Sequence, residues 1–299
     1  MALALCKELS AIEALEEALV NCYRTQIGSL PGPEQRRHLS QLRDANEELH
    51  KLSGSQPVDY DLPAIGDAYA LKFHLMRADN LLISLGACKS AKALPERAQV
   101  LDLGSGTGSS AWALAAWTAT KGGSYDIASI EESQEMTKTS HMLWRSLQRQ
   151  NRLSGASISL ASAMPTCDIL VANHLFSMPL NPSDARRQMK LFGTYAAQIR
   201  SGGVGIILTP NVDEKLALTQ RAVQSLFNEG FELILEEENA EPPRNVTTSD
   251  HRRPVELCQL RRELDQMGES AGVGQVFRDP EFDDPYFGFY GRLTIFRRP

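Results

Sequence analysis

Apolar residues recur at helical spacing through the first third of the chain. Leu5, Leu9, Ile12, Leu15 and Leu19 stand among glutamates, and this spacing places them on one face of an amphipathic helix. Proline and glycine interrupt the pattern, which then resumes twice before residue 95. The predicted helices cover residues 3–26, 34–52 and 66–85. We therefore assign residues 1–95 to an N-terminal helical region. By analogy with a fold class, such helices form a cap that shapes a substrate region, and the alternative is a dimerisation surface.

The pattern changes at residue 99, where a continuous apolar run replaces the helical spacing. The run Val-Leu-Asp-Leu at residues 100–103 is typical of a buried parallel strand, and a glycine-rich loop and a helix follow it directly. Short apolar strands then alternate with helical segments. The predicted strands cover residues 100–103, 125–130, 156–160, 167–172, 204–208, 231–235 and 287–296, and the predicted helices between them include 134–150, 182–199 and 214–230. This alternation predicts an α/β domain over residues 96–299, with 236–285 as an insertion or lid.

The loop after the first strand has the sequence Gly104-Ser105-Gly106-Thr107-Gly108. Glycine permits positive φ and a close approach of the backbone to a ligand. A dinucleotide-binding loop has the spacing G-x-G-x-x-G, whereas this loop has G-x-G-x-G. Asp102 stands two positions before the first glycine, where its charge repels a pyrophosphate and attracts a cation such as a sulfonium. Both observations favour a sulfonium cofactor over a nicotinamide dinucleotide.

Two acidic residues, Glu131 and Glu132, follow the second predicted strand. A carboxylate about 20–30 positions after the glycines accepts hydrogen bonds from both hydroxyls of a ribose. The two residues are therefore candidates for binding the ribose of a nucleoside cofactor.

The run D-L-G-S-G-T-G resembles the first motif of the class I S-adenosylmethionine (SAM) methyltransferases. The run from Glu131 to Met136 resembles their ribose-binding pattern, acidic-x-Ser-x-x-Met, which favours Glu131 over Glu132. The resemblance implies a Rossmann-like sheet of seven strands, mostly parallel with the last strand antiparallel. It also implies SAM as cofactor and S-adenosylhomocysteine (SAH) as product. The cofactor-binding residues that it implies are Asp102, Gly104, Ser105, Gly106, Gly108, Glu131, Glu132, Ser162, Ala163 and Asn173.

Candidate catalytic residues follow the fourth predicted strand. Asn173 and His174 come directly after it, at the sheet edge where ligands of open α/β sheets bind. A histidine at a strand end is either a general base or a structural residue, and both roles stay open here. Tyr69, in the third predicted helix, is a candidate for shielding a sulfonium by a cation–π contact. The Asn-Pro-Pro-Tyr signature of amino-group DNA methyltransferases is absent at this position, which disfavours that chemistry.

Residues 60–235 resemble, more specifically, the methyltransferase-like proteins of the mitochondrial and bacterial small ribosomal subunit. Ala68-Tyr69-Ala70, the glycine motif with its tryptophan, and Ile130-Glu131-Glu132-Ser133 carry this resemblance. That family holds an iron–sulfur cluster with four cysteines. The corresponding half of this chain has only Cys167 and Cys258, so the cluster is not expected here.

The composition of the chain indicates which classes of partner and which cellular location to expect. Of 299 residues, 42% are hydrophobic and 23% are charged, which is typical of soluble globular proteins, and the net charge of −6 disfavours RNA as a partner. Five scattered cysteines without a C-x-x-C pair indicate no metal site. No run of apolar residues is long enough to span a membrane, and the N-terminus carries glutamates instead of a signal peptide. We therefore expect a cytoplasmic protein that does not bind membranes.

The leading hypothesis is a SAM-dependent methyltransferase that transfers a methyl group to a small-molecule or protein acceptor. One alternative is a methyltransferase-like factor of rRNA modification or ribosome assembly, which predicts that the Arg-Arg pairs of the chain gather beside the cofactor pocket. Another is a non-catalytic scaffold with the same fold, which predicts an occluded pocket.

Overall fold

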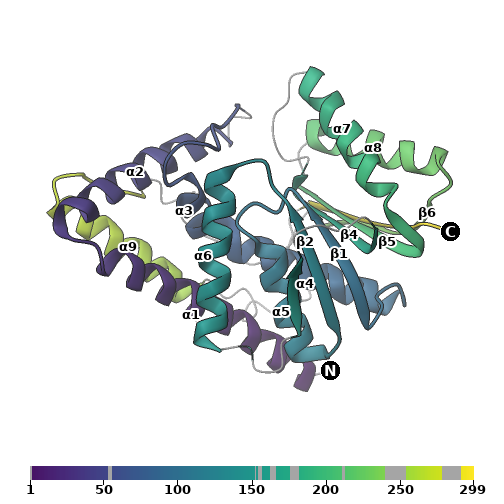
Figure 1. Ribbon diagram of the computed structural model, residues 1–299, viewed down its shortest axis with the longest axis horizontal. Coiled ribbons are helices and arrows are strands. Elements are labelled where there is room, and N and C mark those ends of the chain that lie inside the picture. Colours follow the sequence, from purple (N-terminus) through teal and green to yellow (C-terminus); the bar gives the residue numbers. More distant parts are fainter. Residues whose placement is uncertain are drawn as a thin grey trace.

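The computed structural model describes residues 2–52, 56–151, 153, 157–161, 166–175, 182–210, 213–239, 254–277 and 291–299. At the centre of this part of the chain is a seven-stranded sheet in the order β3-β2-β1-β4-β5-β7-β6 (Figure 1). The strands are β1 (Arg97–Leu103), β2 (Ser124–Ile130), β3 (Ile158–Ala161), β4 (Cys167–Asn173), β5 (Ile199–Pro210), β6 (Glu232–Asn239) and β7 (Gly291–Arg297).

Strands β1 to β5 pair in parallel, and β7 lies antiparallel between β5 and β6. This is the 3-2-1-4-5-6 order of a doubly wound sheet with one further strand inserted. The predicted seven-stranded, mostly parallel sheet with an antiparallel last strand is therefore confirmed. Because the strand order reverses between β1 and β4, the connections leave these two strands in opposite directions and open a crevice at their carboxyl ends.

Helices precede the sheet and then alternate with its strands. They are α1 (Ala2–Gly28), α2 (Gly32–His50), α3 (Ile65–Tyr69), α4 (Leu75–Ser90), α5 (Ser109–Lys121), α6 (Gln134–Gln150), α7 (Pro182–Ala196), α8 (Asp213–Asn228) and α9 (Val255–Ser270). A π-helical turn, η1 (Ala70–His74), joins α3 to α4 without a break. The three predicted N-terminal helices are confirmed, and the third is the continuous helix α3-η1-α4.

The sheet separates two hydrophobic cores because successive side chains of a strand point to opposite faces. On β1, Val100 packs into the core shared with α1, α4 and α5, whereas Leu101 and Leu103 pack into the core shared with α7 and α8. The molecule therefore has three layers, with helices on both faces of the sheet (Figure 1).

The N-terminal helices are built into the first of these cores. Leu15 of α1, Leu81 of α4 and Trp112 of α5 are buried in one cluster that continues onto the sheet. Helix α9 packs against α1 and α2, at the far side of this layer from α7 and α8 (Figure 1). The division of the chain at residue 95 and the lid role of residues 236–285 remain predictions.

No helix within the described ranges is long and apolar enough to cross a membrane. The cytoplasmic location remains a prediction.

Candidate functional site

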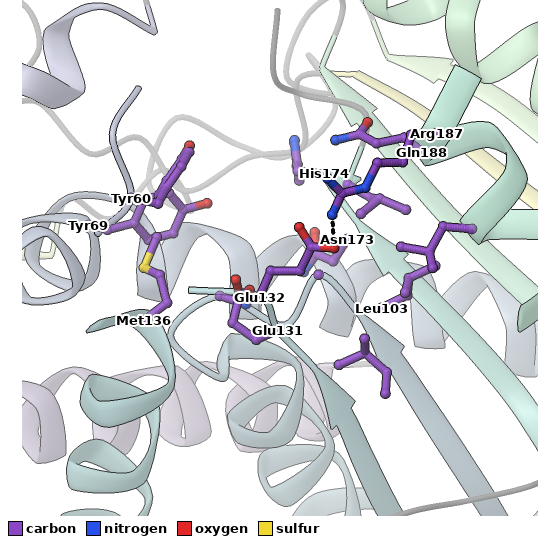
Figure 2. Close-up of a pocket in the computed structure, with 15 residues that line it drawn as sticks. Tyr60, Tyr69, Leu103, Glu131, Glu132, Met136, Asn173, His174, Arg187 and Gln188 are labelled. Atoms are coloured by element: carbon purple, nitrogen blue, oxygen red, sulfur yellow. Dashed lines mark hydrogen bonds and ion pairs between the residues drawn. The ribbon is translucent and has the colours of Figure 1, made fainter. Parts of the chain in front are cut away.

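A cleft of about 300 Å³ opens at the carboxyl ends of β1, β2 and β4, next to the point where the strand order reverses (Figure 2). Its described lining consists of Tyr60, Tyr69, Leu103, Gly104, Gly106, Ile130, Glu131, Glu132, Met136, Asn173, His174, Leu175, Arg187, Gln188 and Leu191. These residues come from β1, β2, β4 and their following loops, from helices α3, α6 and α7, and from the segment before α3. Ligands of open α/β sheets bind at this place in the fold.

The glycine loop forms the floor of the cleft and is fastened to the end of β2. The backbone N–H groups of Gly104 and Ser105 donate to the carbonyl oxygen of Ile130, at 2.8 and 3.1 Å. The N–H of Gly106 donates to Oε2 of Glu131 at 2.7 Å. Gly106 has a φ of +54°, a left-handed conformation that glycine adopts without strain. These three N–H groups of the loop are therefore hydrogen-bonded to β2 and to Glu131.

The side chains of the adjacent residues Glu131 and Glu132 make different contacts. Glu131 accepts through both oxygens, because Oε1 takes the N–H of Ser133 at 2.9 Å while Oε2 takes that of Gly106. Glu132 turns outward and forms an ion pair of 2.7 Å with Arg187 of α7, in which both side chains are about 70% exposed. Figure 2 shows this pair reaching across the cleft. An ion pair so exposed contributes little stability.

Asp102 lies beneath the loop with no solvent exposure. Ser110 of α5 donates to its Oδ1 at 3.0 Å, and its Oδ2 has no hydrogen-bond partner among the described residues. Burial raises the pKa of Asp102 to about 7, the nearby Glu131 raises it slightly, and the Ser110 hydrogen bond opposes the increase. The carboxylate is therefore a buried group that a positive charge would stabilise.

Aromatic side chains form the wall opposite α7 (Figure 2). The rings of Tyr60 and Tyr69 meet edge to face with centroids 6.4 Å apart, and Phe73 packs on Tyr69 at 5.0 Å. A Cβ on Gly106 would lie 3.9 Å from Cε1 of Tyr69, so the Tyr69 ring lies next to the loop. Burial raises the pKa of Tyr60, so its hydroxyl stays protonated and available as a donor.

The end of β4 brings Asn173 and His174 into the cleft, as their sequence position predicts. Asn173 donates through Nδ2 to the carbonyl oxygen of Arg77 at 3.0 Å. His174 has a φ of +63°, and its Nε2 lies 3.4 Å from Nδ2 of Asn80. Both residues are more than nine-tenths buried, and both are held by α4. A positive φ is uncommon for a residue with a Cβ, and such outliers persist where the surrounding structure enforces them.

Seven of the predicted site residues line the cleft: Tyr69, Gly104, Gly106, Glu131, Glu132, Asn173 and His174. Asp102, Ser105 and Gly108 are not among the lining residues, and Ser162 and Ala163 lie outside the described residues. Sequence reasoning missed Tyr60, Met136 as a lining residue, and the α7 residues Arg187, Gln188 and Leu191. The α7 residues could have been predicted, because α7 directly follows β4. Segments that follow the strands where the strand order reverses surround the crevice.

Of the Arg-Arg pairs, the one at residues 186 and 187 lies beside the cleft, where Arg187 is part of the lining. The pair at residues 36 and 37 lies on α2 and the pair at 186 and 187 on α7, at opposite ends of the molecule (Figure 1). Arg261 of α9 is buried, and the pair at 252 and 253 is outside the described residues. Among the described residues, only the pair at 186 and 187 is therefore beside the cleft, and the RNA alternative remains a hypothesis.

No protein-family model and no curated protein matches this chain. Solved structures with some likeness include a putative class I SAM-dependent methyltransferase from Listeria monocytogenes, with a TM-score of 0.45 and 9% identity over 96% of this chain and 88% of that chain. A putative SAM-dependent methyltransferase from Methanococcus maripaludis has a TM-score of 0.36 and 15% identity over 81% and 95%. Coclaurine N-methyltransferase bound to N-methylheliamine and SAH has 0.37 and 10% over 93% and 98%. Likenesses this distant carry no argument about the chemistry of the cleft.

Proposed function

We propose that this protein is a SAM-dependent methyltransferase acting on a small-molecule or protein acceptor. The observation that carries the proposal is the pair of carboxylates, Asp102 and Glu131, at the ends of adjacent strands beside a glycine loop whose N–H groups are already hydrogen-bonded. The strand order, with its crevice between β1 and β4, supplies the place for a nucleoside cofactor.

The charge around the loop favours a cationic ligand over a pyrophosphate. A phosphate that used the loop N–H groups would have to displace the Ile130 carbonyl and the Glu131 carboxylate. It would also lie close to the buried Asp102, and two negative groups in a partly buried site repel strongly. An ammonium or sulfonium group instead compensates the oxygen of Asp102 that has no partner among the described residues.

The cleft also offers groups suited to the ribose, the sulfonium and the purine ring of SAM. Each carboxylate oxygen of Glu131 accepts one backbone N–H and keeps a second acceptor site for a ribose hydroxyl. The rings of Tyr69 and Tyr60 offer faces for cation–π contact with a sulfonium. Ile130, Met136 and Leu191 provide apolar surface of the kind that binds a purine ring.

Bound SAM supplies a methyl group that its sulfonium has already activated for transfer. The work of this chain is then to align the acceptor and exclude water. In our proposal Asn173 orients the acceptor, and Tyr69 shields the reacting centre. His174 accepts a proton from those acceptors that must lose one before or during transfer. This role requires space for a ligand, which the cleft of about 300 Å³ among the described residues offers, whereas the scaffold alternative predicts an occluded pocket.

Calorimetric titration of the full chain with SAM, SAH and NAD⁺ tests the proposal. We expect SAM and SAH to bind and NAD⁺ not to bind, after which transfer of labelled methyl can be screened across candidate acceptors. Binding of NAD⁺ but not SAH, or of neither compound by the folded protein, would contradict the proposed function.

A further inference from the structure

The helix that faces the glycine loop contains a wider turn, η1 (Ala70–His74). In a regular α-helix, residues five positions apart point in directions about 140° apart, because each residue advances by about 100°. In a π turn the hydrogen bonds join residues i and i+5, so two residues at this spacing lie one above the other. Tyr69 and His74 are five positions apart, and the π turn directs both toward the glycine loop.

Both side chains lie next to the loop. The Tyr69 ring is close enough to Gly106 that a Cβ added there would come within 3.9 Å of it. The Nδ1 of His74 is hydrogen-bonded to Oγ1 of Thr107 at 2.9 Å, and its ring packs edge to face on Trp112, with centroids 4.6 Å apart. Burial lowers the pKa of His74 to about 3, so the ring is neutral. His74 thus joins the loop to the first part of α5.

An arginine from the far end of the chain reaches the π turn. Arg261 of α9 is 3% exposed. Its Nε donates to the carbonyl oxygen of Leu71 at 3.0 Å, and its Nη2 donates to the same oxygen. Leu71 is the second residue of η1. A side chain that bonds into the hydrogen-bond ladder of a helix is one of the recognised causes of its local distortion.

The surroundings of Arg261 fix this contact. The Phe277 ring lies 5.6 Å from the guanidinium carbon. Asp265, one turn further along α9, accepts the backbone N–H groups of Val276 and Phe277 at 2.8 and 2.7 Å. Since a buried guanidinium is costly unless its N–H groups are used, this arrangement favours the bonds to Leu71 over other conformations of the arginine.

We propose that Arg261 is a positioning residue of the cofactor site, because its bonds to Leu71 stabilise the π turn that holds Tyr69 and His74 against the glycine loop. The nature of the ligand rests on the proposed function, whereas the connection from α9 to the loop does not. Helix α9 is then part of the binding machinery although none of its described residues lines the cleft.

The first test compares the SAH affinity of Arg261→Met with that of Arg262→Met, an exposed arginine on the same helix. We expect Arg261→Met to weaken SAH binding by about fivefold or more, since contacting networks carry coupling of this size. Arg262→Met should bind as the wild type does. Arg261→Lys keeps a cationic donor and should recover part of the lost affinity. Wild-type affinity in a folded Arg261→Met protein would overturn the proposal.

A double-mutant cycle separates positioning from a general loss of stability. If Arg261 acts through the residues over the loop, Arg261→Met should cost less than about twofold in SAH affinity when Tyr69→Ala is already present. An equal loss of SAH affinity in the wild-type and Tyr69→Ala backgrounds would mean that Arg261 affects binding independently of Tyr69. That result would overturn the proposal that Arg261 acts through the residues over the loop.

Hydrogen exchange in the ligand-free protein tests the connection even if SAH does not bind. In Arg261→Met we expect faster exchange of the amides at residues 104–108 and 70–76, with unchanged exchange in the buried strand β4 as the reference for global stability. Unchanged exchange at the loop would overturn the proposal. Failure of the wild type to bind SAH, with the expected exchange pattern, would reject the proposed function and leave the positioning role supported.

Discussion

Among the residues of the site, Asp102 has surroundings that make its protonation state depend on pH near neutrality. It is buried, with one oxygen bonded to Ser110 and the other lacking a partner among the described residues. Its pKa is raised to about 7 from an ordinary value of 3.8. Between these values the folded protein holds a proton that the unfolded chain has lost, so the contribution of Asp102 to stability falls as pH rises through this window.

Burial favours the protonated form of Asp102. A cationic ligand favours the ionised form, because a positive charge interacts best with a carboxylate. We therefore expect the affinity for SAH, through its ammonium group, to rise by up to about tenfold per pH unit below about pH 7 and to level off above it. Calorimetry across this range should also detect proton release on binding. Asp102→Asn should bind more weakly at high pH and show a flat profile. A pH-dependent profile that survives in Asp102→Asn would assign the titration to another group.

At the scale of elements, the close approach of the glycine loop to α6 depends on Gly108. This residue, the N-cap of α5, has a φ of +83°, and a Cβ on it would lie 2.4 Å from Oγ of Ser140 on α6. The end of the loop and α6 are therefore packed at this point as closely as a glycine permits.

Gly108→Ala should lower the free energy of unfolding by about 2–4 kcal/mol, from the left-handed conformation and the steric clash together. Ser140→Ala removes the clashing oxygen, so the double variant should recover the steric part and keep a loss of about 1–2 kcal/mol. Denaturant unfolding of the two single variants and the double variant measures both parts. Equal stability of Gly108→Ala and wild type, or the absence of any rescue, would contradict the packing described here.

The elements that the sequence predicted well are those with local causes. The run from Val100 to Gly108 contains its own strand, turn and helix start, and the predicted positions of Glu131, Asn173 and His174 follow from the rule that strand ends meet at one sheet edge. The π turn has no local signal, because the group that bonds to it, Arg261, lies 190 residues away. Tyr60 sits outside any periodic segment, so nothing in the pattern placed it in the cleft.

At the scale of the whole molecule, the N-terminal helices and the sheet share one core. Leu15 on α1 is fully buried in the cluster that contains Trp112 and Trp117 of α5. The pattern of apolar residues predicted the helices, but it carried no information about which surface their apolar faces cover. Only the folded arrangement shows that α1 packs against α5 and α6.

A shared core predicts one cooperative unfolding transition. Leu15→Ala should lower the free energy of unfolding by about 2–5 kcal/mol. All three tryptophans, Trp112, Trp117 and Trp144, lie after residue 95, so fluorescence reports on the sheet half of the chain while circular dichroism reports on all helices. Both signals should shift together in Leu15→Ala. Two transitions in circular dichroism, or midpoints that differ between the two signals, would show that the N-terminal helices unfold separately.

If the carboxylates at the strand ends bind SAM, removing the charge of Glu131 should weaken ligand binding. Glu131→Gln keeps the size of the side chain and removes the charge and one acceptor oxygen. Glu135→Gln, on the first turn of α6 and outside the cleft lining, is the matched control.

We would measure the dissociation constant of SAH for the wild type and both variants by calorimetry. We predict that Glu131→Gln weakens binding by about ten- to a hundredfold, the cost of losing hydrogen bonds to a charged acceptor, and that Glu135→Gln changes it by less than about threefold. Equal affinity of wild type and Glu131→Gln would contradict the account of this cleft as a SAM site.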